Sequence, residues 1–383
     1  MLLSDNARAE LDALLHAAVE RRDIPGVVAI VANRERVLYR GAVGMRDAHG
    51  SSAMSADAIF MIASMTKPVT SVAIMMLREE GRLELADPIG RYLPDLMGRE
   101  VLVAFNESDA SYTTRPAIRE VTIHDLLTHT AGFGYDFSND TLRILCKGGE
   151  RSERDLPLLH DPGSQWTYGL STRLLGEVIE RITGELLAVF FESRIFRPLG
   201  MRDTGFDLKP EELRRLVSLF RRVDGALVDE PRPASYEPFI AGDGCLLSTA
   251  DDYIRFLQML LNMGQFDSAR LLTNQSVNEM TMNQIGSLKV QQQPGAIPEL
   301  SNPFPLGAGK DTFSLGFQLK EGDGENARSH GSYSWAGLYN THFWADPHQG
   351  IAAVLLMQVL PFYDDRCIQL LTDFEHHIYR NLG

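Results

Sequence analysis

The sequence predicts an α+β fold in which an antiparallel sheet is flanked by helices and interrupted by an inserted, mainly helical lobe. Helix and strand patterns open the chain and return at its end, whereas residues between about 84 and 199 carry mostly helical signals. A chain of 383 residues, 44% of them hydrophobic, can bury a core in two or three lobes. We therefore expect a discontinuous α/β domain formed by residues 1–82 and 200–383, and a helical domain formed by residues 83–199.

The first predicted elements run from a surface helix to a buried one. Leu11, Leu15 and Ala18 recur at helical spacing near the N-terminus. Residues 27–32 and 36–42 then predict two strands joined by a polar turn. An apolar stretch follows, and residues 65–80 predict a buried helix that stops at a glycine.

The later elements alternate between the two domains. Thr122 and Asp125 have the spacing of a capping box, which predicts a helix start, and a further helix is expected before Gly184. Strands return after residue 332, and a final helix carries apolar residues at helical spacing. The Gln/Pro-rich residues 290–304 are expected to form a long surface loop.

The bulk properties exclude several classes of function. A formal net charge of -14 opposes binding to phosphate backbones and anionic lipids, so we expect no nucleic-acid partner. Charges between Asp5 and Asp12 interrupt any signal-peptide core, and no apolar run approaches the roughly 20 residues of a membrane span. Cys146, Cys245 and Cys367 are odd in number and far apart, which predicts reduced thiols. A cytoplasmic protein without a membrane partner is expected.

Ser64 and Lys67 form the first candidate for chemistry. On a helix, positions i and i+3 share a face, so the Lys67 amine is expected beside the Ser64 hydroxyl. Apolar neighbours disfavour a charged ammonium, which suits Lys67 as a base for a serine nucleophile. The Ser64 N–H, at a helix N-terminus, is suited to an oxyanion hole. An S-x-x-K sequence arises by chance about once per 300 residues, so the rest of the chain has to decide.

Six segments supply that context. They are FMIASMTKPVTSVAIMMLREEGRLELADPIGRYLPDL, VTIHDLLTHTAGF, DPGSQWTYGLSTRLLGEVIERITG, IFRPLGMRDTGF, GCLLSTADDYIRFLQMLL and YSWAGLYNTHFWADP. In this order the chain resembles the class C β-lactamases and family VIII carboxylesterases, a group that includes penicillin-binding DD-peptidases and related amide hydrolases. The resemblance implies a β-lactamase/transpeptidase-like fold, with Ser64 as nucleophile and Lys67 as its activating partner.

The segment WTYGLS places Tyr168 where this group has its catalytic tyrosine. The resemblance implies that the Tyr168 phenol carries the proton from the nucleophile to the leaving group and helps activate the deacylating water. The alternative is that Tyr168 merely packs this loop against the helix after it.

The segment YSWAGL carries Trp335, Gly337 and Leu338 where β-lactamases and peptidases of the group have K-T-G. The resemblance implies an oxyanion hole formed by the N–H groups of Ser64 and Leu338. Trp335 replaces a lysine that attracts substrate carboxylates, and matches the W-x-G pattern of family VIII esterases. Leu170 stands where Y-x-N has an amide-binding asparagine. Loss of these polar groups weakens the binding of charged amide substrates by about several kcal/mol in total. This change predicts an esterase.

The remaining polar residues are given no catalytic role. His124 and His129 do not share a helix face and make a poor metal pair, and the sequence has no H-E-x-x-H or G-x-S-x-G motif. His330 is near the W-A-G segment but is assigned no function. We expect no metal and no cofactor. Phe133 and Tyr135 are candidates to line the substrate pocket.

The sequence thus predicts a serine carboxylesterase that cleaves small carboxylic esters through a Ser64 acyl-enzyme, with Lys67 and Tyr168 as the acid–base pair. Alternatives on the same scaffold are a β-lactamase, a D-amino-acid amidase or peptidase, and an acyltransferase. An alternative of another class is a non-catalytic sensor that stops at a long-lived acyl adduct. The natural ester, its acyl chain length and the oligomeric state are not determined by the sequence.

Overall fold

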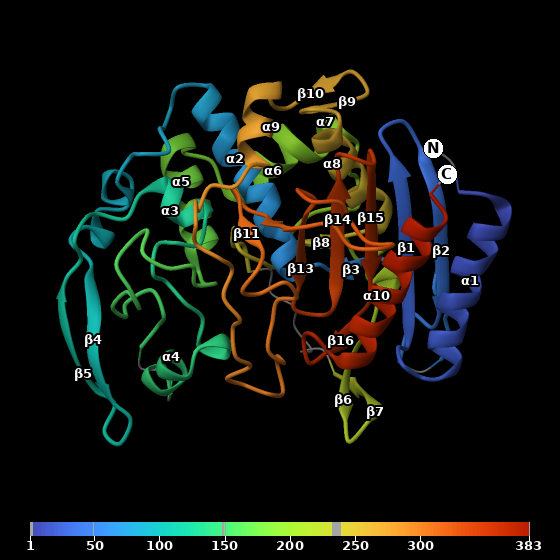
Figure 1. The fold of residues 1–383 in the computed structure, drawn as a ribbon, viewed down its shortest axis with the longest axis horizontal. Coiled ribbons are helices and arrows are strands. Elements are labelled where there is room, and N and C mark those ends of the chain that lie inside the picture. Colours follow the sequence, from blue (N-terminus) through green and yellow to red (C-terminus); the bar gives the residue numbers. More distant parts are fainter. Residues whose placement is uncertain (1–2, 49, 148, 150, 232–238, 383) are drawn as a thin grey trace.

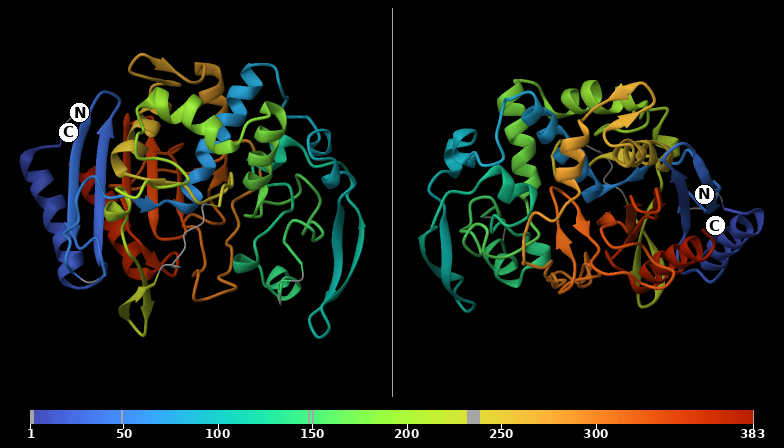
Figure 2. Two further views of the ribbon diagram at one scale, coloured as in Figure 1. Left: turned by 180° about the vertical axis from the view of Figure 1, so that it is seen from behind. Right: turned by 45° about the horizontal axis from the view of Figure 1, so that its top comes forward.

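A central antiparallel sheet with helices on both faces lies beside a second block of chain (Figure 1). The structure is a computed structural model that describes residues 3–48, 50–147, 149, 151–231 and 239–382. The two ends of the chain lie close together at the side of the sheet that is far from the second block (Figure 2). The predicted α+β class is confirmed.

The central sheet has the strand order β11-β12-β13-β14-β15-β1-β2, and each neighbouring pair is antiparallel. The pairing of β15 with β1 joins a late strand of the chain to the first one. The strands are β1 (Gly26–Asn33), β2 (Val37–Gly44), β11 (Thr312–Phe313), β12 (Gln318–Leu319), β13 (Tyr333–Gly337), β14 (Thr341–Asp346) and β15 (Ile351–Leu356).

Strand β1 shows how both faces of this sheet are buried. Val27 and Ala29 pack in the cluster that contains the terminal helices, whereas Val28 and Ile30 pack in the cluster that contains the internal helices. Successive side chains of a strand point to opposite faces, so a strand between two helical layers is apolar throughout. The terminal helices are α1 (Asp5–Glu20) and α10 (Asp365–Arg380), and the internal ones are α2 (Thr66–Glu79) and α8 (Ala250–Leu261).

The second block contains helices and also a hairpin that the sequence analysis missed. Strands β4 (Glu100–Asn106) and β5 (Ser111–Pro116) pair there and project from the edge of the molecule (Figure 1). Both strands are largely exposed, so neither has the alternation of apolar residues that marks a half-buried strand. The helices of this block are α3 (Ile123–Leu127), α4 (Asp140–Leu145) and α5 (Ser171–Thr183). Helices α6 (Leu187–Phe191) and α7 (Arg197–Leu199) follow along the chain and lead back to the sheet, where α7 contacts α8. The proposed domain boundaries remain a prediction.

Short strand pairs connect the layers. Strand β3 pairs with β8 directly before the turn that carries Ser64, and this pairing attaches the turn to the chain before α8. The short elements are β3 (Phe60–Met61), β6 (Leu219–Val223), β7 (Ala226–Glu230), β8 (Leu247–Ser248), β9 (Gln265–Phe266), β10 (Ala269–Arg270), β16 (Val359–Leu360) and α9 (Asn274–Met280).

Residues 290–304 lack regular structure, as predicted, but they are not simply a surface loop. Gln293 and Phe304 exchange backbone hydrogen bonds, which closes the segment on itself. The Phe304 ring is 1% exposed and meets the ring of Tyr168 edge-on, with 5.6 Å between centroids. The Gln/Pro composition predicted an exposed loop, but the residues at its two ends, Val290 and Phe304, are buried. Through Phe304 the segment packs against the candidate site.

No helix in the described part of the chain is both long enough and apolar enough to cross a membrane.

Phe374 of α10 provides a test of the packing between the terminal helices and the sheet. Its ring is fully buried between Tyr39 and Trp344. Phe374→Ala should lower the free energy of unfolding by about 3–5 kcal/mol, because it removes apolar contacts and leaves a cavity. Urea denaturation followed by circular dichroism measures this loss. Ile118→Ala, at a side chain that is 74% exposed, should stay within about 0.5 kcal/mol of the wild type; equal losses in both variants would contradict the packing described.

Candidate active site

The turn that carries Ser64 is held between the central sheet and helix α2. Ser64 lies in a single 3₁₀ turn, Ala63–Met65, and Ala63 has the left-handed backbone angle φ of 42°. Strand β13 passes so close that a Cβ on Gly337 would lie 2.2 Å from the carbonyl oxygen of Ile62. Because Gly337 has no side chain, the end of β13 can approach the turn that carries Ser64.

Lys67 lies in the first turn of α2 and is 2% exposed. Its Nζ is 3.1 Å from Ser64 Oγ, which confirms the geometry expected from the i, i+3 spacing. The same nitrogen donates hydrogen bonds to Tyr135 Oη at 3.2 Å and to the carbonyl oxygen of Asp243 at 2.7 Å. The cost of burying an amine is thus offset by three hydrogen-bond partners.

Tyr168 approaches Ser64 from the second block. Its hydroxyl donates a hydrogen bond of 2.7 Å to Ser64 Oγ, and its ring centroid is 4.8 Å from Lys67 Nζ. Trp335 Nε1 donates a long hydrogen bond of 3.4 Å to the Tyr168 hydroxyl. The structure therefore brings together the three residues that the sequence analysis named for catalysis, and places Trp335 against them.

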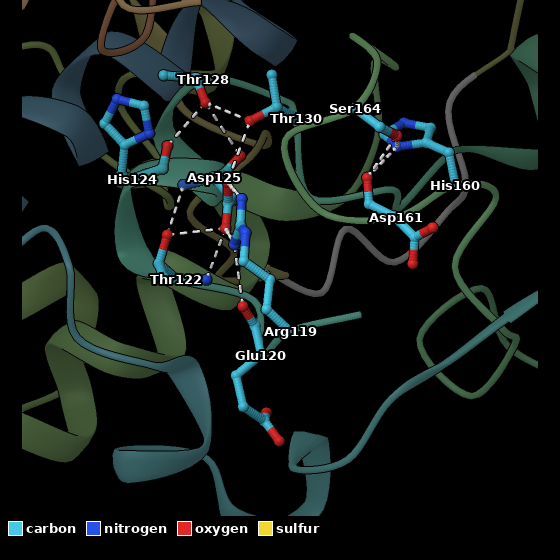
Figure 3. Close-up of polar contacts among 10 residues, drawn as sticks. All are labelled: Arg119, Glu120, Thr122, His124, Asp125, Thr128, Thr130, His160, Asp161 and Ser164. Carbon is cyan, nitrogen blue, oxygen red and sulfur yellow. Dashed lines mark hydrogen bonds and ion pairs between the residues drawn. The ribbon is translucent and has the colours of Figure 1, made fainter. Parts of the chain in front are cut away.

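A polar network fixes the start of α3. Figure 3 shows Asp125 receiving hydrogen bonds from Arg119 at 2.5 and 2.8 Å, from the Thr122 backbone at 2.9 Å and from its hydroxyl at 2.8 Å. The predicted capping box of Thr122 and Asp125 is confirmed. Burial disfavours the charged carboxylate, but the hydrogen bonds from Arg119 and Thr122 outweigh this effect and lower the pKa of Asp125.

The loop that carries Tyr168 is attached to this network through backbone bonds. The Gly163 N–H donates to the Thr130 carbonyl at 2.8 Å, and the Thr167 N–H donates to the His129 carbonyl at 2.9 Å. His160 Nε2 and the Thr167 hydroxyl are 3.0 Å apart. The His160 turn, with Asp161 and Ser164, is drawn beside the Asp125 network in Figure 3. The position of the tyrosine therefore depends on the chain just after α3.

A cavity of about 270 Å³ opens beside Ser64. Ser64, Tyr135 and Tyr168 contribute to its wall together with Arg173 and Asp243. Most of the remaining wall is apolar or aromatic and comes from Met61, Phe137, Phe239, Trp335, Leu338 and Tyr339. A concave, mainly apolar site with a few polar groups at one point is typical of a small-molecule pocket.

The predicted pocket residues divide into two groups. Tyr135, Trp335 and Leu338 line the cavity. Phe133 and Leu170 are 2% and 1% exposed, belong to the main hydrophobic core and are outside the lining. Leu170 directly precedes α5, which turns its side chain into the core. Phe133 and Leu170 are therefore core residues that are near Tyr135 and Tyr168 in the sequence, and neither reaches the cavity.

Neither His330 nor His129, both considered in the sequence analysis, lines the cavity. His330 is on an exposed turn near Glu321 and does not line the cavity. His129 is buried, and its ring lies 5.0 Å from that of Tyr168. Burial and the charge of Lys67 lower the pKa of His129 well below its usual value, so the ring is neutral. In the described part of the chain, no group of three or more His, Cys, Asp or Glu residues could hold a metal ion.

Asp243 and Arg173 were missed by the sequence analysis. Asp243 is 5% exposed, lies between Gly242 and Gly244, and pairs with Arg173 at 3.2 Å. A Cβ on Gly242 would lie 2.5 Å from the Thr172 carbonyl oxygen, so this segment packs tightly against α5. An acidic residue between two glycines was the available signal, because glycine permits such close approach of backbones.

A serine, a lysine and a tyrosine that converge at the edge of this antiparallel sheet define a serine hydrolase or acyltransferase of the β-lactamase type. A sequence model of the family described as Beta-lactamase matches residues 11–376. The chain therefore belongs to the beta-lactamase family, which confirms the resemblance found in its motifs.

The individual relatives include an esterase and a synthase. The chain is 34% identical to Protein Rv1367c of Mycobacterium tuberculosis, over 88% of this chain and 86% of that protein. It is 29% identical to Esterase EstB of Burkholderia gladioli, over 91% of this chain and 89% of that protein. Its fold is similar to that of simvastatin synthase (LovD) from Aspergillus terreus, with a TM-score of 0.84, 26% identity and 98% of both chains covered.

The Asp125 network predicts a distinctive loss of stability in acid. Because the folded-state pKa of Asp125 is lowered, its charge stabilises the fold above the unfolded pKa of about 4, and this contribution is lost as the pH falls below it. Asp125→Asn should lower the free energy of unfolding at pH 7 by about 1–3 kcal/mol. Urea denaturation between pH 3 and pH 7 should show the two proteins converging in acid. A difference that does not change with pH would contradict this account.

Proposed function

We propose that the protein is a carboxylesterase that cleaves small carboxylic esters through an acyl-enzyme on Ser64. The observation that carries this proposal is the convergence of Lys67 Nζ, at 3.1 Å, and Tyr168 Oη, at 2.7 Å, on Ser64 Oγ at the wall of a mainly apolar cavity. A nucleophile, a base and a proton carrier within hydrogen-bond distance are what two-step acyl transfer requires. The 29% identity with Esterase EstB supports the same reaction class.

In the proposed acylation, Lys67 in its neutral form takes the Ser64 proton as Oγ attacks the ester carbonyl. Ser64 and Leu338 both line the cavity, and their N–H groups are the proposed donors to the oxyanion. Tyr168 then gives its proton to the departing alkoxide and regains one from Lys67. This sequence leaves a neutral alcohol, an acylated Ser64 and a neutral amine.

Deacylation repeats these proton transfers with water as the nucleophile. Tyr168 and Lys67 take a proton from the water as it attacks the acyl carbonyl, and Ser64 Oγ is reprotonated as it leaves. The carboxylic acid is released, and the resting site is restored.

The lining of the cavity supports an ester rather than a β-lactam as substrate. Trp335 places an indole beside Tyr168 where the related β-lactamases have a lysine, so the cavity lacks that cation for a substrate carboxylate. Leu170 is buried in the core and offers no amide group to the ligand. The cation that does line the cavity, Arg173, is paired with Asp243. A neutral ester with a small apolar acyl group fits such a wall.

Acyl transfer to an alcohol is the second candidate. The likeness to simvastatin synthase over nearly the whole chain favours it, and the same acyl-enzyme serves both reactions, because only the group that attacks in the second step differs. Adding a small alcohol to the ester assay separates the two. A new ester formed faster than the free acid would favour transfer over hydrolysis.

The nucleophile is tested with two chromogenic substrates. Wild-type protein should turn over p-nitrophenyl butyrate much faster than a chromogenic cephalosporin, and Ser64→Ala should lose both activities and its covalent labelling by a fluorophosphonate. Labelling that persists at another residue would reject Ser64. Efficient cephalosporin turnover would instead reject the specificity inferred from Trp335. A stoichiometric burst without turnover would favour the sensor.

The role of Tyr168 is tested by removing its hydroxyl alone. Tyr168→Phe should lower kcat by about 10²–10⁴-fold with little change in KM, because the hydroxyl carries protons in both half-reactions. Steady-state kinetics with p-nitrophenyl butyrate measures the change. Tyr92→Phe, which removes a hydrogen bond to Asp87 outside the cavity, is the control and should keep its kcat. A full kcat in Tyr168→Phe would assign Tyr168 to packing only.

A further inference from the structure

Tyr135 and Asp243 are the two hydrogen-bond partners of Lys67 other than Ser64. Tyr135 Oη donates a hydrogen bond of 2.5 Å to Asp243 Oδ2, and it accepts one of 3.2 Å from Lys67 Nζ. The Asp243 backbone carbonyl accepts a second hydrogen bond from Lys67, at 2.7 Å. Asp243 therefore contacts the lysine twice, once directly and once through the phenol of Tyr135.

The direction of the hydrogen bond between Tyr135 and Asp243 is determined by their chemistry. An ionised carboxylate only accepts hydrogen bonds, so the phenol must be the donor. Burial, and next the charge of Asp243, raise the pKa of Tyr135 well above its usual value, so the phenol keeps its proton. Because that proton is directed at Asp243, the Tyr135 oxygen can only act as an acceptor toward Lys67.

This direction determines where the lone pair of Lys67 points. The charged lysine has three N–H donors, which match Ser64 Oγ, Tyr135 Oη and the Asp243 carbonyl. The neutral lysine has two N–H donors and one lone pair. Tyr135 Oη and the Asp243 carbonyl are both obligate acceptors and take the two N–H groups, so the lone pair is left facing Ser64 Oγ.

We propose that Tyr135 and the side chain of Asp243 are positioning residues that orient the lone pair of neutral Lys67 toward the Ser64 hydroxyl. The proposal rests on the proposed function, in which Ser64 is the nucleophile and Lys67 its base. It assigns to Tyr135 a role in the proton chemistry that differs from the pocket-lining role expected from the sequence.

The surroundings of Asp243 hold its carboxylate in the orientation that this role needs. Arg173 Nε donates to both carboxylate oxygens, at 3.3 and 3.2 Å, from the first turns of α5. The Thr70 hydroxyl donates to the preceding carbonyl, that of Gly242, at 2.6 Å. The guanidinium also places a positive charge beside this buried side chain. Helices α2 and α5 thus both fix the segment that orients the base.

A double-mutant cycle tests whether Asp243 acts through the Tyr135 proton. The variants are Asp243→Asn, whose amide can also donate to the phenol oxygen, Tyr135→Phe, which removes that oxygen, and the double variant. Tyr39→Phe is the matched control, because Tyr39 also donates to a carboxylate, that of Asp12 at 2.8 Å, but packs against α10, away from the cavity. For each protein, kcat and KM for p-nitrophenyl butyrate, the rate of Ser64 labelling by a fluorophosphonate and the melting temperature are measured.

Each single variant should lower kcat and the labelling rate by about tenfold or more, with KM changed less than about threefold. The double variant should be no slower than Tyr135→Phe alone, because the two residues act in series. Tyr39→Phe should keep its kcat. A double variant with the product of the two single losses would reject the series arrangement, and a normal kcat in Tyr135→Phe would reject the proposal even where Asp243→Asn lowers the melting temperature.

The same measurements separate this proposal from the proposed function. If wild-type Ser64 is not labelled and the wild type does not turn over the ester, the nucleophile itself is wrong. If wild-type Ser64 is labelled and both single variants match the wild type, the nucleophile stands and the positioning role is wrong.

Discussion

A buried amine that has to be surrounded by hydrogen-bond partners is the constraint around which this molecule is arranged. Lys67 is 2% exposed, and its three partners come from the turn before α2, from the chain after α3 and from the segment before β8. Burying an amine without such partners would lower the free energy of unfolding by about several kcal/mol. The segments that surround Ser64 therefore meet at this nitrogen, and the candidate reactive groups lie there with them.

The sheet contributes rigidity to this meeting point. Strand β1 and strand β15 are buried on both faces, so the strands that lead to the site cannot shift without disturbing two helical layers. Gly337 brings the end of β13 within contact of the nucleophile turn, and the β3–β8 pair attaches that turn from the other side. These contacts hold Ser64 beside the end of the sheet.

The second block contributes Tyr168, the proposed proton carrier, to the site. Tyr168 stands on a loop that is bonded to the chain after α3, and its ring is surrounded by His129, Trp335 and Phe304. These aromatic contacts leave a polar end near Ser64 and an apolar wall within one cavity. This cavity fits the proposed substrate, a neutral ester with a small apolar acyl group.

Local signals in the sequence were enough for much of the fold, and the resemblance to a known family added three candidate site residues. The i, i+3 spacing of Ser64 and Lys67 and the capping box at Thr122 need only a helix, and the strands that are buried on both faces are apolar throughout, so each was predicted from neighbouring residues. Tyr168 was placed through the resemblance of its segment. The exposed β4–β5 hairpin was not found, because a strand that is solvated on both faces has no apolar period.

Asp243, Arg173 and the role of Tyr135 were decided by the tertiary structure alone. Asp243 is 108 residues from Tyr135 and 176 from Lys67, and no local spacing relates them. Phe133 and Leu170 illustrate the opposite case, since both flank site residues in the sequence yet face the core. The sequence by itself determined most of the helices and strands that carry the candidate residues, because these elements depend on short-range spacing. Which side chains surround the reacting atoms depends on how distant segments pack, and only the folded chain settles that.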